Sequence, residues 1–278
     1  MSRTSFASGK IILSGEYAVL FGRAGIGIPS RTGIEVVFGE DAACDGIEIS
    51  WDAPPVWLSY VHKVLELCRE KRGDVRGRLT IHSTLPLGKG MGSSTALIIA
   101  IVRVFIGSEA RETALKIENI LSPSNSGFDF AVVWQSVPIL YKKGEAQPIE
   151  LPPTLLQNGV LIDTGIPGEP TNELVAWMKN RKSEIQDSLN TIANCTERLA
   201  CGEPLEIVMR EHHAAQVALG VVPPSVQEMI AAIENVGGAA KVIGAGSRSG
   251  GAGMVLALGN QEAIHNIAAE RNMPTLAL

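Results

Sequence analysis

The segment from Pro86 to Thr95 reads Pro-Leu-Gly-Lys-Gly-Met-Gly-Ser-Ser-Thr and could bind phosphate. Its alternating glycines, which begin at Gly88, expose backbone N–H groups with no side chains in the way. The apolar run that follows predicts a buried helix over 93–105, whose N-terminus adds partial positive charge and unpaired donors. Loop and helix start together form an anion site suited to phosphate. A simple helix cap at Ser93 is the alternative.

This loop differs from two common phosphate-binding patterns. A Walker A motif needs Gly-Lys followed by Ser or Thr, whereas Lys89 is followed by Gly90. A Rossmann fingerprint needs an acidic residue about 20 residues further on at the end of a second strand, and none is found there. The hydroxyls of Ser93 and Ser94 at the helix start could bind a phosphate oxygen or Mg²⁺.

Two further segments combine glycine with lysine. In the first, Lys10 precedes an apolar strand and a Gly15-Glu16-Tyr17 turn, where its charge could point into a cleft or simply be solvated. The second runs from Lys241 to Gly253 and places five glycines between two expected strands. A tight hairpin needs fewer glycines, so this segment is either a turn or a loop that closes on a phosphorylated ligand.

A mixture of helices and strands must position these segments. Hydrophobic periodicity predicts a strand that enters a turn over 10–19, and strands over 33–38, 46–51, 78–83, 132–141, 159–163, 240–243 and 254–258. It predicts helices over 56–72, 93–105, 111–121, 171–181, 185–200, 204–219, 225–236 and 261–271. The two kinds of element do not alternate strictly, which favours an α+β fold over a doubly wound sheet. Turn formers near Pro152 and Asn158 predict a boundary between domains 1–155 and 156–278.

Composition narrows the functional class. The 278 residues carry a net charge of −5 with 45% hydrophobic and 19% charged residues, as in globular proteins. The sequence contains no block of basic residues, which argues against a nucleic-acid partner. The longest apolar stretch, 96–106, is too short to cross a membrane, and the first eight residues lack a signal pattern. Four cysteines without a C-x-x-C pair indicate free thiols, so we expect a cytoplasmic protein.

The three glycine segments, in this order, resemble the three motifs of the GHMP kinases, a family that includes galactokinase, homoserine kinase, mevalonate kinase and phosphomevalonate kinase. Those motifs read roughly PGK-x-x-L-x-GEH, P-x-G-x-GLGSSA and K-x-TGAG-x-GG, and the resemblance covers almost the whole chain. The chain departs from them at Tyr17, where mevalonate kinases usually have His. It also inserts Ser247-Arg248-Ser249 into the third motif.

A further stretch, Ile117 to Asp129, resembles the part of mevalonate kinases in which a glutamate precedes PSG-x-D, although Phe130 replaces the usual Asn. The segment from Leu161 to Thr171 resembles a strand and turn of the same enzymes. His212 and His213 are adjacent and diverge by roughly 100° on a helix, so they are not expected to share a metal.

The resemblance implies a GHMP kinase fold with two α+β domains, the second ferredoxin-like, and an active site in the cleft between them. It implies transfer of the ATP γ-phosphoryl group to an alcohol, with mevalonate as the preferred acceptor. Asp129 and Lys10 would be catalytic, and Glu118 with Ser94 would hold Mg²⁺. The residues implied to bind nucleotide are Pro86, Gly88, Lys89, Gly90, Gly92, Ser93, Ser94, Thr95, Gly244 and Gly246. The residues implied to bind the acceptor are Glu16, Tyr17, Thr171 and Ala245.

Other functions stay open. The chain could phosphorylate phosphomevalonate, homoserine or a sugar, could be a diphosphomevalonate decarboxylase, or could be a binding protein without chemistry on this fold. A second phosphate on the acceptor calls for several converging cations, and the candidates are few: Arg31, Lys142, Lys143 and Arg248. This favours mevalonate. The sequence leaves the oligomeric state open, a homodimer included.

Overall fold

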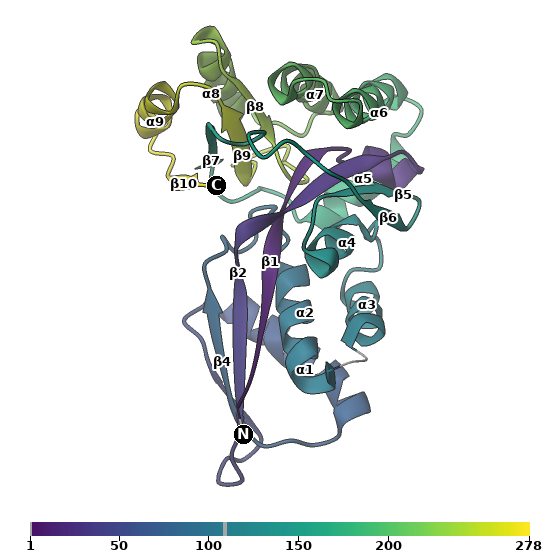
Figure 1. Ribbon diagram of the computed structural model, residues 1–278, viewed down its shortest axis with the longest axis vertical. Helices are drawn as coiled ribbons and strands as arrows, with labels where there is room; N and C mark the ends of the chain where they lie inside the picture. The colour runs from purple at the N-terminus through teal and green to yellow at the C-terminus, as the bar shows by residue number, and fades with distance from the viewer. Residues whose placement is uncertain (1, 108–109) are drawn as a thin grey trace.

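The computed structural model describes residues 2–107 and 110–278, and its long axis follows two long antiparallel strands (Figure 1). These are β1 (Ser2–Ser14) and β2 (Gly25–Glu40), which belong to a six-stranded sheet. The other strands of this sheet are β3 (Ile47–Ser50), β4 (Gly77–Ser83), β5 (Ile139–Lys142) and β6 (Glu145–Pro148). β4 and β5 pair antiparallel with β2, β3 runs parallel to β4, and β6 pairs with β5.

The two ends of β1 lie in different surroundings. The first residues alternate between exposed and partly buried, whereas every residue from Ala7 to Ser14 is buried. A strand covered on both faces reads as a nearly continuous apolar run, and Ile11-Ile12-Leu13 is such a run. β1 therefore carries Lys10 from the open end of the sheet into the interior.

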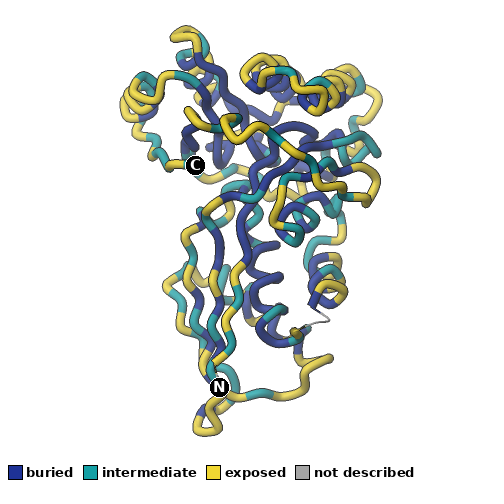
Figure 2. The backbone as a smooth tube through the Cα atoms, viewed as in Figure 1, coloured by how far each residue is buried: buried dark blue, intermediate teal, exposed yellow. Residues whose placement is uncertain are grey.

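Helices α1 (Pro55–Arg72), α2 (Ser93–Ile106) and α3 (Ala110–Leu121) lie together beside β1, β2 and β4 (Figure 1). α2 is buried almost all round, and its trace is dark along nearly its whole length in Figure 2. Even so, no helix of the described residues has the length and apolarity needed to cross a membrane. A short helix, α4 (Phe128–Gln135), also contacts α2 and leads into β5.

The second half of the chain forms a four-stranded antiparallel sheet in the order β10-β7-β9-β8. Its strands are β7 (Gly159–Asp163), β8 (Ala239–Val242), β9 (Met254–Leu258) and β10 (Thr275–Ala277). Helices α5 (Thr171–Asn180), α6 (Gln186–Ala200), α7 (Leu205–Leu219) and α8 (Pro224–Asn235) connect β7 to β8, and α9 (Gln261–Ala269) connects β9 to β10. Counting the connecting helices as one layer, this is the β-α-β-β-α-β order of ferredoxin-like folds.

The α+β class predicted from the sequence is confirmed, and most elements begin and end within a few residues of their predicted bounds. The strand predicted over 132–141 is wrong. Its first part is the end of α4, which starts after the left-handed Gly127, and only Ile139–Lys142 is extended. Val132 and Val133 suggested a strand, but both are fully buried in the helix, so packing outweighs their β propensity.

Candidate active site

A cavity of about 700 Å³ brings the three glycine segments together. Its walls come from the end of β1, the start of α2, the turn between α3 and α4, the first turns of α5 and the loop after β8. Fourteen of the residues predicted from the sequence line it: Lys10, Glu16, Tyr17, Gly88, Gly90, Gly92, Ser93, Ser94, Thr95, Glu118, Asp129, Thr171, Gly244 and Ala245. Pro86, Lys89 and Gly246 do not.

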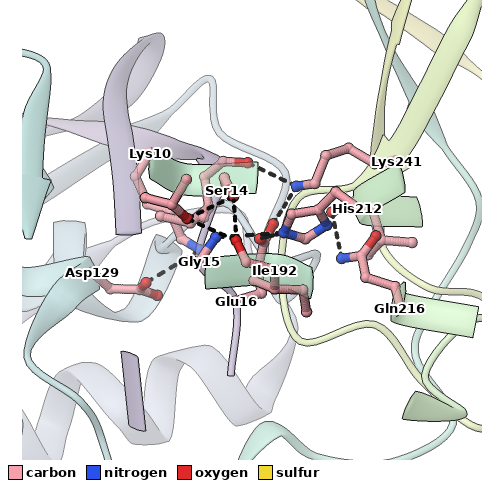
Figure 3. A network of polar contacts seen from close by, with 12 residues as sticks. Lys10, Ser14, Gly15, Glu16, Asp129, Ile192, His212, Gln216 and Lys241 are labelled. Carbon is pink, nitrogen blue, oxygen red and sulfur yellow. Dashed lines mark hydrogen bonds and ion pairs between the residues drawn. The ribbon is translucent and has the colours of Figure 1, made fainter. Parts of the chain in front are cut away.

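Lys10 and Asp129 form an ion pair at this cavity (Figure 3). Lys10 Nζ lies 3.2 Å from Asp129 Oδ1, and the lysine side chain is 4% exposed whereas the aspartate side chain is 45% exposed. The backbone N–H of Lys10 donates to the carbonyl oxygen of Met91 at 2.9 Å, so β1 is fastened to the second glycine segment. A Cβ on Gly92 would lie only 2.9 Å from Lys10 Cγ, so glycine leaves room for the lysine.

The second and third glycine segments touch through their backbones. Gly90 has a left-handed φ of 82°, and a Cβ built on Gly244 would lie 2.8 Å from Gly90 Cα. Any side chain at Gly244 would therefore push the two loops apart. The N–H of Gly88 donates to Ser93 Oγ at 3.0 Å, so the hydroxyl of Ser93 helps to shape the loop before α2.

Glu118 of α3 is a buried carboxylate that faces the cavity. Thr95 Oγ1 donates to its Oε1 at 2.8 Å, whereas its Oε2 has no hydrogen-bond partner among the described residues. Burial raises the pKa of Glu118 to about 7; the Thr95 hydrogen bond opposes this rise, and the nearby charge of Asp129 adds to it. A buried carboxylate with one unsatisfied oxygen fits a site that binds a cation, because a positive charge would offset the cost of burial.

Glu16 lies in the turn after β1 and contacts two residues from the second half of the chain (Figure 3). Its carboxylate pairs with the ammonium of Lys241 in β8 and with the imidazole of His212 in α7. Sequence reasoning did not find this cluster. Lys241 stood out only as the start of the third segment, although a lysine within the buried strand Ala239–Val242 is a signal that it needs a partner.

Tyr17 and α5 form the remaining wall. Tyr17 has a left-handed φ of 62°, and its hydroxyl donates to the carbonyl oxygen of Ala245 in the third segment. Thr171, Asn172 and Val175 face the cavity from the start of α5. The cavity also includes Trp57 and residues 121–127, which the sequence did not predict as a wall. The Ser-Pro-Ser-Asn-Ser composition of that turn was a signal for a loop, but not for its orientation.

Lys89 points away from the cavity. Its ammonium pairs with Asp163 at the end of β7, and its carbonyl oxygen accepts from the N–H of Met254 at 3.0 Å. The second glycine segment is therefore attached to the C-terminal sheet by both the side chain and the backbone of one residue. Gly246 also packs closely against another segment of the fold, because a Cβ there would lie 2.1 Å from the carbonyl oxygen of Val221.

Comparisons with known proteins show similarity in sequence and in fold. Residues 59–135 match the family model of the GHMP kinases N terminal domain. A mevalonate kinase of Thermococcus sibiricus is 28% identical over 291 residues, covering 86% of this chain and 85% of the relative. The crystal structure of Methanococcus jannaschii mevalonate kinase superimposes with a TM-score of 0.78 at 18% identity, covering 99% of this chain and 96% of the other. Streptococcus pneumoniae phosphomevalonate kinase, in complex with phosphomevalonate and AMPPNP, superimposes with a TM-score of 0.74 at 15% identity. This match covers 99% of this chain and 98% of the other.

The two structural matches show a shared fold. The matched family domain contains the second glycine segment together with Glu118 and Asp129, and the similarity to the Thermococcus protein extends over most of both chains. Residues 59–135 are therefore similar to the GHMP kinases N terminal domain, and the chain as a whole resembles mevalonate kinases in sequence and in fold.

Proposed function

We propose that this chain is an ATP-dependent kinase that transfers the γ-phosphoryl group of ATP to the primary hydroxyl of mevalonate. The observation that carries the proposal is the Lys10–Asp129 ion pair at a cavity lined by all three glycine segments. Phosphoryl transfer depends mainly on positioning and on neutralising charge, and an enclosed lysine beside an accessible aspartate supplies both. The similarity to a mevalonate kinase over most of the chain supports the same activity.

The second glycine segment and the N-terminus of α2 would bind the phosphates of ATP. Backbone N–H groups at a helix N-terminus attract anions, and Gly88, Gly90 and Gly92 line the cavity without side chains. Ser93 and Ser94 face the same cavity from the first turn of α2. Gly244 and Ala245 of the third segment would close the opposite side.

Mg²⁺ fits beside Glu118 and Ser94. The unpartnered Oε2 of Glu118 supplies an oxygen ligand of the type that Mg²⁺ prefers. No group of three or more His, Cys, Asp or Glu side chains within residues 2–107 and 110–278 is arranged to hold a metal, so most ligands would be phosphate oxygens and water, as is usual for Mg²⁺ with a nucleotide. A bound Mg²⁺ neutralises charge on the phosphates.

Asp129 would orient the acceptor hydroxyl and receive its proton as the oxygen–phosphorus bond forms. In the same reaction the bond between the γ-phosphorus and the bridging oxygen breaks, and ADP leaves with that electron pair. Lys10 would hold Asp129 in place and neutralise charge on the group in transfer. The products are a phosphate ester, ADP and a proton.

The supply of cations favours mevalonate over phosphomevalonate as the acceptor. Of the lysines and arginines in the described part of the chain, Lys10 alone lines the cavity; Arg31, Lys142, Lys143 and Arg248 do not. A second phosphate would normally need converging arginines or lysines. A single carboxylate, by contrast, can be bound by the helix N-terminus at Thr171 and Asn172.

The test measures phosphate transfer to mevalonate, phosphomevalonate, homoserine and galactose under identical Mg²⁺ and ATP concentrations. We expect the largest kcat/KM for mevalonate and background transfer in Asp129→Asn with every acceptor. A larger kcat/KM for phosphomevalonate would overturn the proposed acceptor and leave the kinase assignment in place. ATP-dependent transfer to none of them would count against the kinase itself.

A further inference from the structure

A buried ion pair joins the first glycine segment to the third (Figure 3). Lys241 contacts the carboxylate of Glu16 and donates to the carbonyl oxygen of Ile12 at 3.0 Å. His212 approaches the same carboxylate, with Nε2 2.9 Å from Oε2. The side chain of Glu16 is 5% exposed and the other two are 0% exposed. Two residues of the second half thus enclose one carboxylate of the first half.

The charges of this cluster balance. Burial alone would raise the pKa of Glu16, but the charge of Lys241 and the contact with His212 hold it at about 2. Burial lowers the pKa of the Lys241 ammonium, and the Glu16 charge opposes that effect. Burial also lowers the pKa of His212, which favours the neutral imidazole. One carboxylate and one ammonium therefore neutralise each other, and the imidazole adds a hydrogen bond.

The proton of His212 belongs on Nε2. This nitrogen lies 2.9 Å from the Glu16 carboxylate, whereas the N–H of Gly15 points toward it at 3.4 Å, which is long for a hydrogen bond. A short contact to a charged acceptor is the stronger interaction, so the imidazole donates to Glu16. The Gln216 side chain, whose amide nitrogen donates to Val242 O at 3.0 Å, lies on the other side of the ring (Figure 3).

The cluster lies directly behind two residues of the cavity wall. Tyr17 follows Glu16, and Ala245 is in the loop that follows Lys241, so the Tyr17–Ala245 hydrogen bond is a second link between the same two segments. Tyr17 also has a left-handed φ of 62°, which is unfavourable for a residue with a Cβ and persists only where neighbours hold it.

We propose that Lys241 and His212 are positioning residues for acceptor binding. Through Glu16 they fix the Gly15–Tyr17 turn against the third glycine segment, and so set the shape of the wall formed by Tyr17 and Ala245. Neither residue lines the cavity, so neither acts by touching the acceptor. The effect on acceptor binding rests on the proposed kinase function, whereas the effect on the turn does not.

The test compares Lys241→Met, His212→Leu and His212→Gln with the exposed control Lys179→Met. We expect the acceptor KM to rise about tenfold or more in Lys241→Met and His212→Leu, and the dissociation constant of ATP to change less than about threefold. Glutamine can place an amide N–H near the position of Nε2, so His212→Gln should recover most of the loss. Lys179→Met should match the wild type.

Hydrogen exchange provides a readout that needs no acceptor. In Lys241→Met and His212→Leu, amides of residues 12–22 should exchange faster, while those of α2 stay unchanged. Unchanged exchange at 12–22 would overturn the proposal even if the chain phosphorylates a different acceptor. Faster exchange with an unchanged acceptor KM would show that the cluster is merely structural, which also overturns it.

Removing one partner of a buried ion pair can prevent folding, and the double variant Glu16→Gln/Lys241→Met addresses that outcome. It removes both charges, so it should unfold at a higher denaturant concentration than Lys241→Met. Its acceptor KM should stay raised, because the turn has lost its attachment. A double variant that is no more stable than Lys241→Met would contradict the pairing.

Discussion

The ammonium of Lys10 lies 3.2 Å from the carboxylate of Asp129 and joins the buried part of β1 to the first turn of α4. The lysine is enclosed, whereas nearly half of the aspartate side chain is accessible. An immobile cation therefore holds a carboxylate that an acceptor hydroxyl can reach. This asymmetry leads to the first prediction.

Asp129→Asn should lower kcat by roughly 10²–10⁴-fold, because an amide cannot accept the hydroxyl proton. The fold should be retained, since the side chain is partly exposed and asparagine has the same shape. Steady-state transfer assays measure the loss, and calorimetry with a non-hydrolysable ATP analogue checks that the nucleotide still binds. Asp187→Asn in α6 is the control. A folded Asp129→Asn enzyme that keeps more than about half of its turnover would remove Asp129 from the mechanism.

Gly90→Val should abolish detectable ATP binding. A Cβ at Gly90 would lie 3.2 Å from Gly244 Cα, and the left-handed φ of 82° disfavours a β-branched residue. Gly202→Val is a matched control, because Gly202 has a φ of 90° and nothing within 4 Å of the new Cβ. Both variants carry backbone strain, but only Gly90→Val should lose the nucleotide in calorimetry. Equal ATP affinity in the two would show that this loop does not bind it.

Glu118 should make the metal-free, nucleotide-free protein less stable as the pH rises. Its pKa is raised from 4.5 to about 7 in the folded state, so the folded protein retains the proton more tightly than the unfolded chain. That contribution is fully present below pH 4.5 and is lost as the pH rises through 7. At one pKa unit per 1.36 kcal/mol, the loss amounts to roughly 3 kcal/mol.

Urea unfolding of the wild type and Glu118→Gln between pH 5 and pH 8 measures this contribution. The contribution of Glu118 is the difference in free energy of unfolding between the two proteins at each pH, because other groups also titrate in this range. Burial lowers the pKa of His213 to about 4, so the contribution of His213 to stability rises with pH over part of the same range. Glu16, with a pKa of about 2, loses its contribution only at lower pH. Identical pH slopes for the two proteins would contradict the assigned environment of Glu118.

Lys89→Met should lower the free energy of unfolding by about 1–3 kcal/mol, because it leaves the partly buried Asp163 without its cation. ATP affinity should fall only indirectly, through loosening of the loop, and Asp163→Asn should produce the same loss although it keeps the lysine. Chemical denaturation and calorimetry measure the two quantities. If Lys89→Met weakens ATP binding strongly while Asp163→Asn does not, the lysine binds phosphate directly, as the sequence resemblance implied.

Helices with a long apolar pattern were predictable from the sequence alone. The predicted ranges 56–72 and 93–105 differ from α1 and α2 by one residue at an end, because each pattern extends over several turns. The short strands β6 and β10 were not predicted. Three or four residues at the edge of a sheet carry no period of their own, and their pairing depends on partners elsewhere in the chain.

In the candidate site too, residues within one local motif were predictable, whereas contacts between distant parts of the chain were not. Spacing within the glycine segments pointed to Gly88, Gly90 and Ser94 because that chemistry is local, and all three line the cavity. The partners of Glu16 could not be inferred, since no pattern along the chain relates a residue in the first turn to one in β8. The side chain of Lys89 illustrates the converse: it lies in the right segment, but the charge of Asp163 draws it toward the other sheet.

The pairing of Glu16 with Lys241 also bears on the order in which the protein is made. The ribosome completes the hairpin of β1 and β2 early, because the two strands are close in sequence, while Lys241 follows Glu16 by 225 residues and emerges much later. Until then the Glu16 carboxylate has no ammonium to neutralise it and stays in water. The turn that carries Tyr17 is thus synthesised early but reaches its final position late. A nascent chain that stalls before β8 has its phosphate-binding loop but no finished wall for the acceptor.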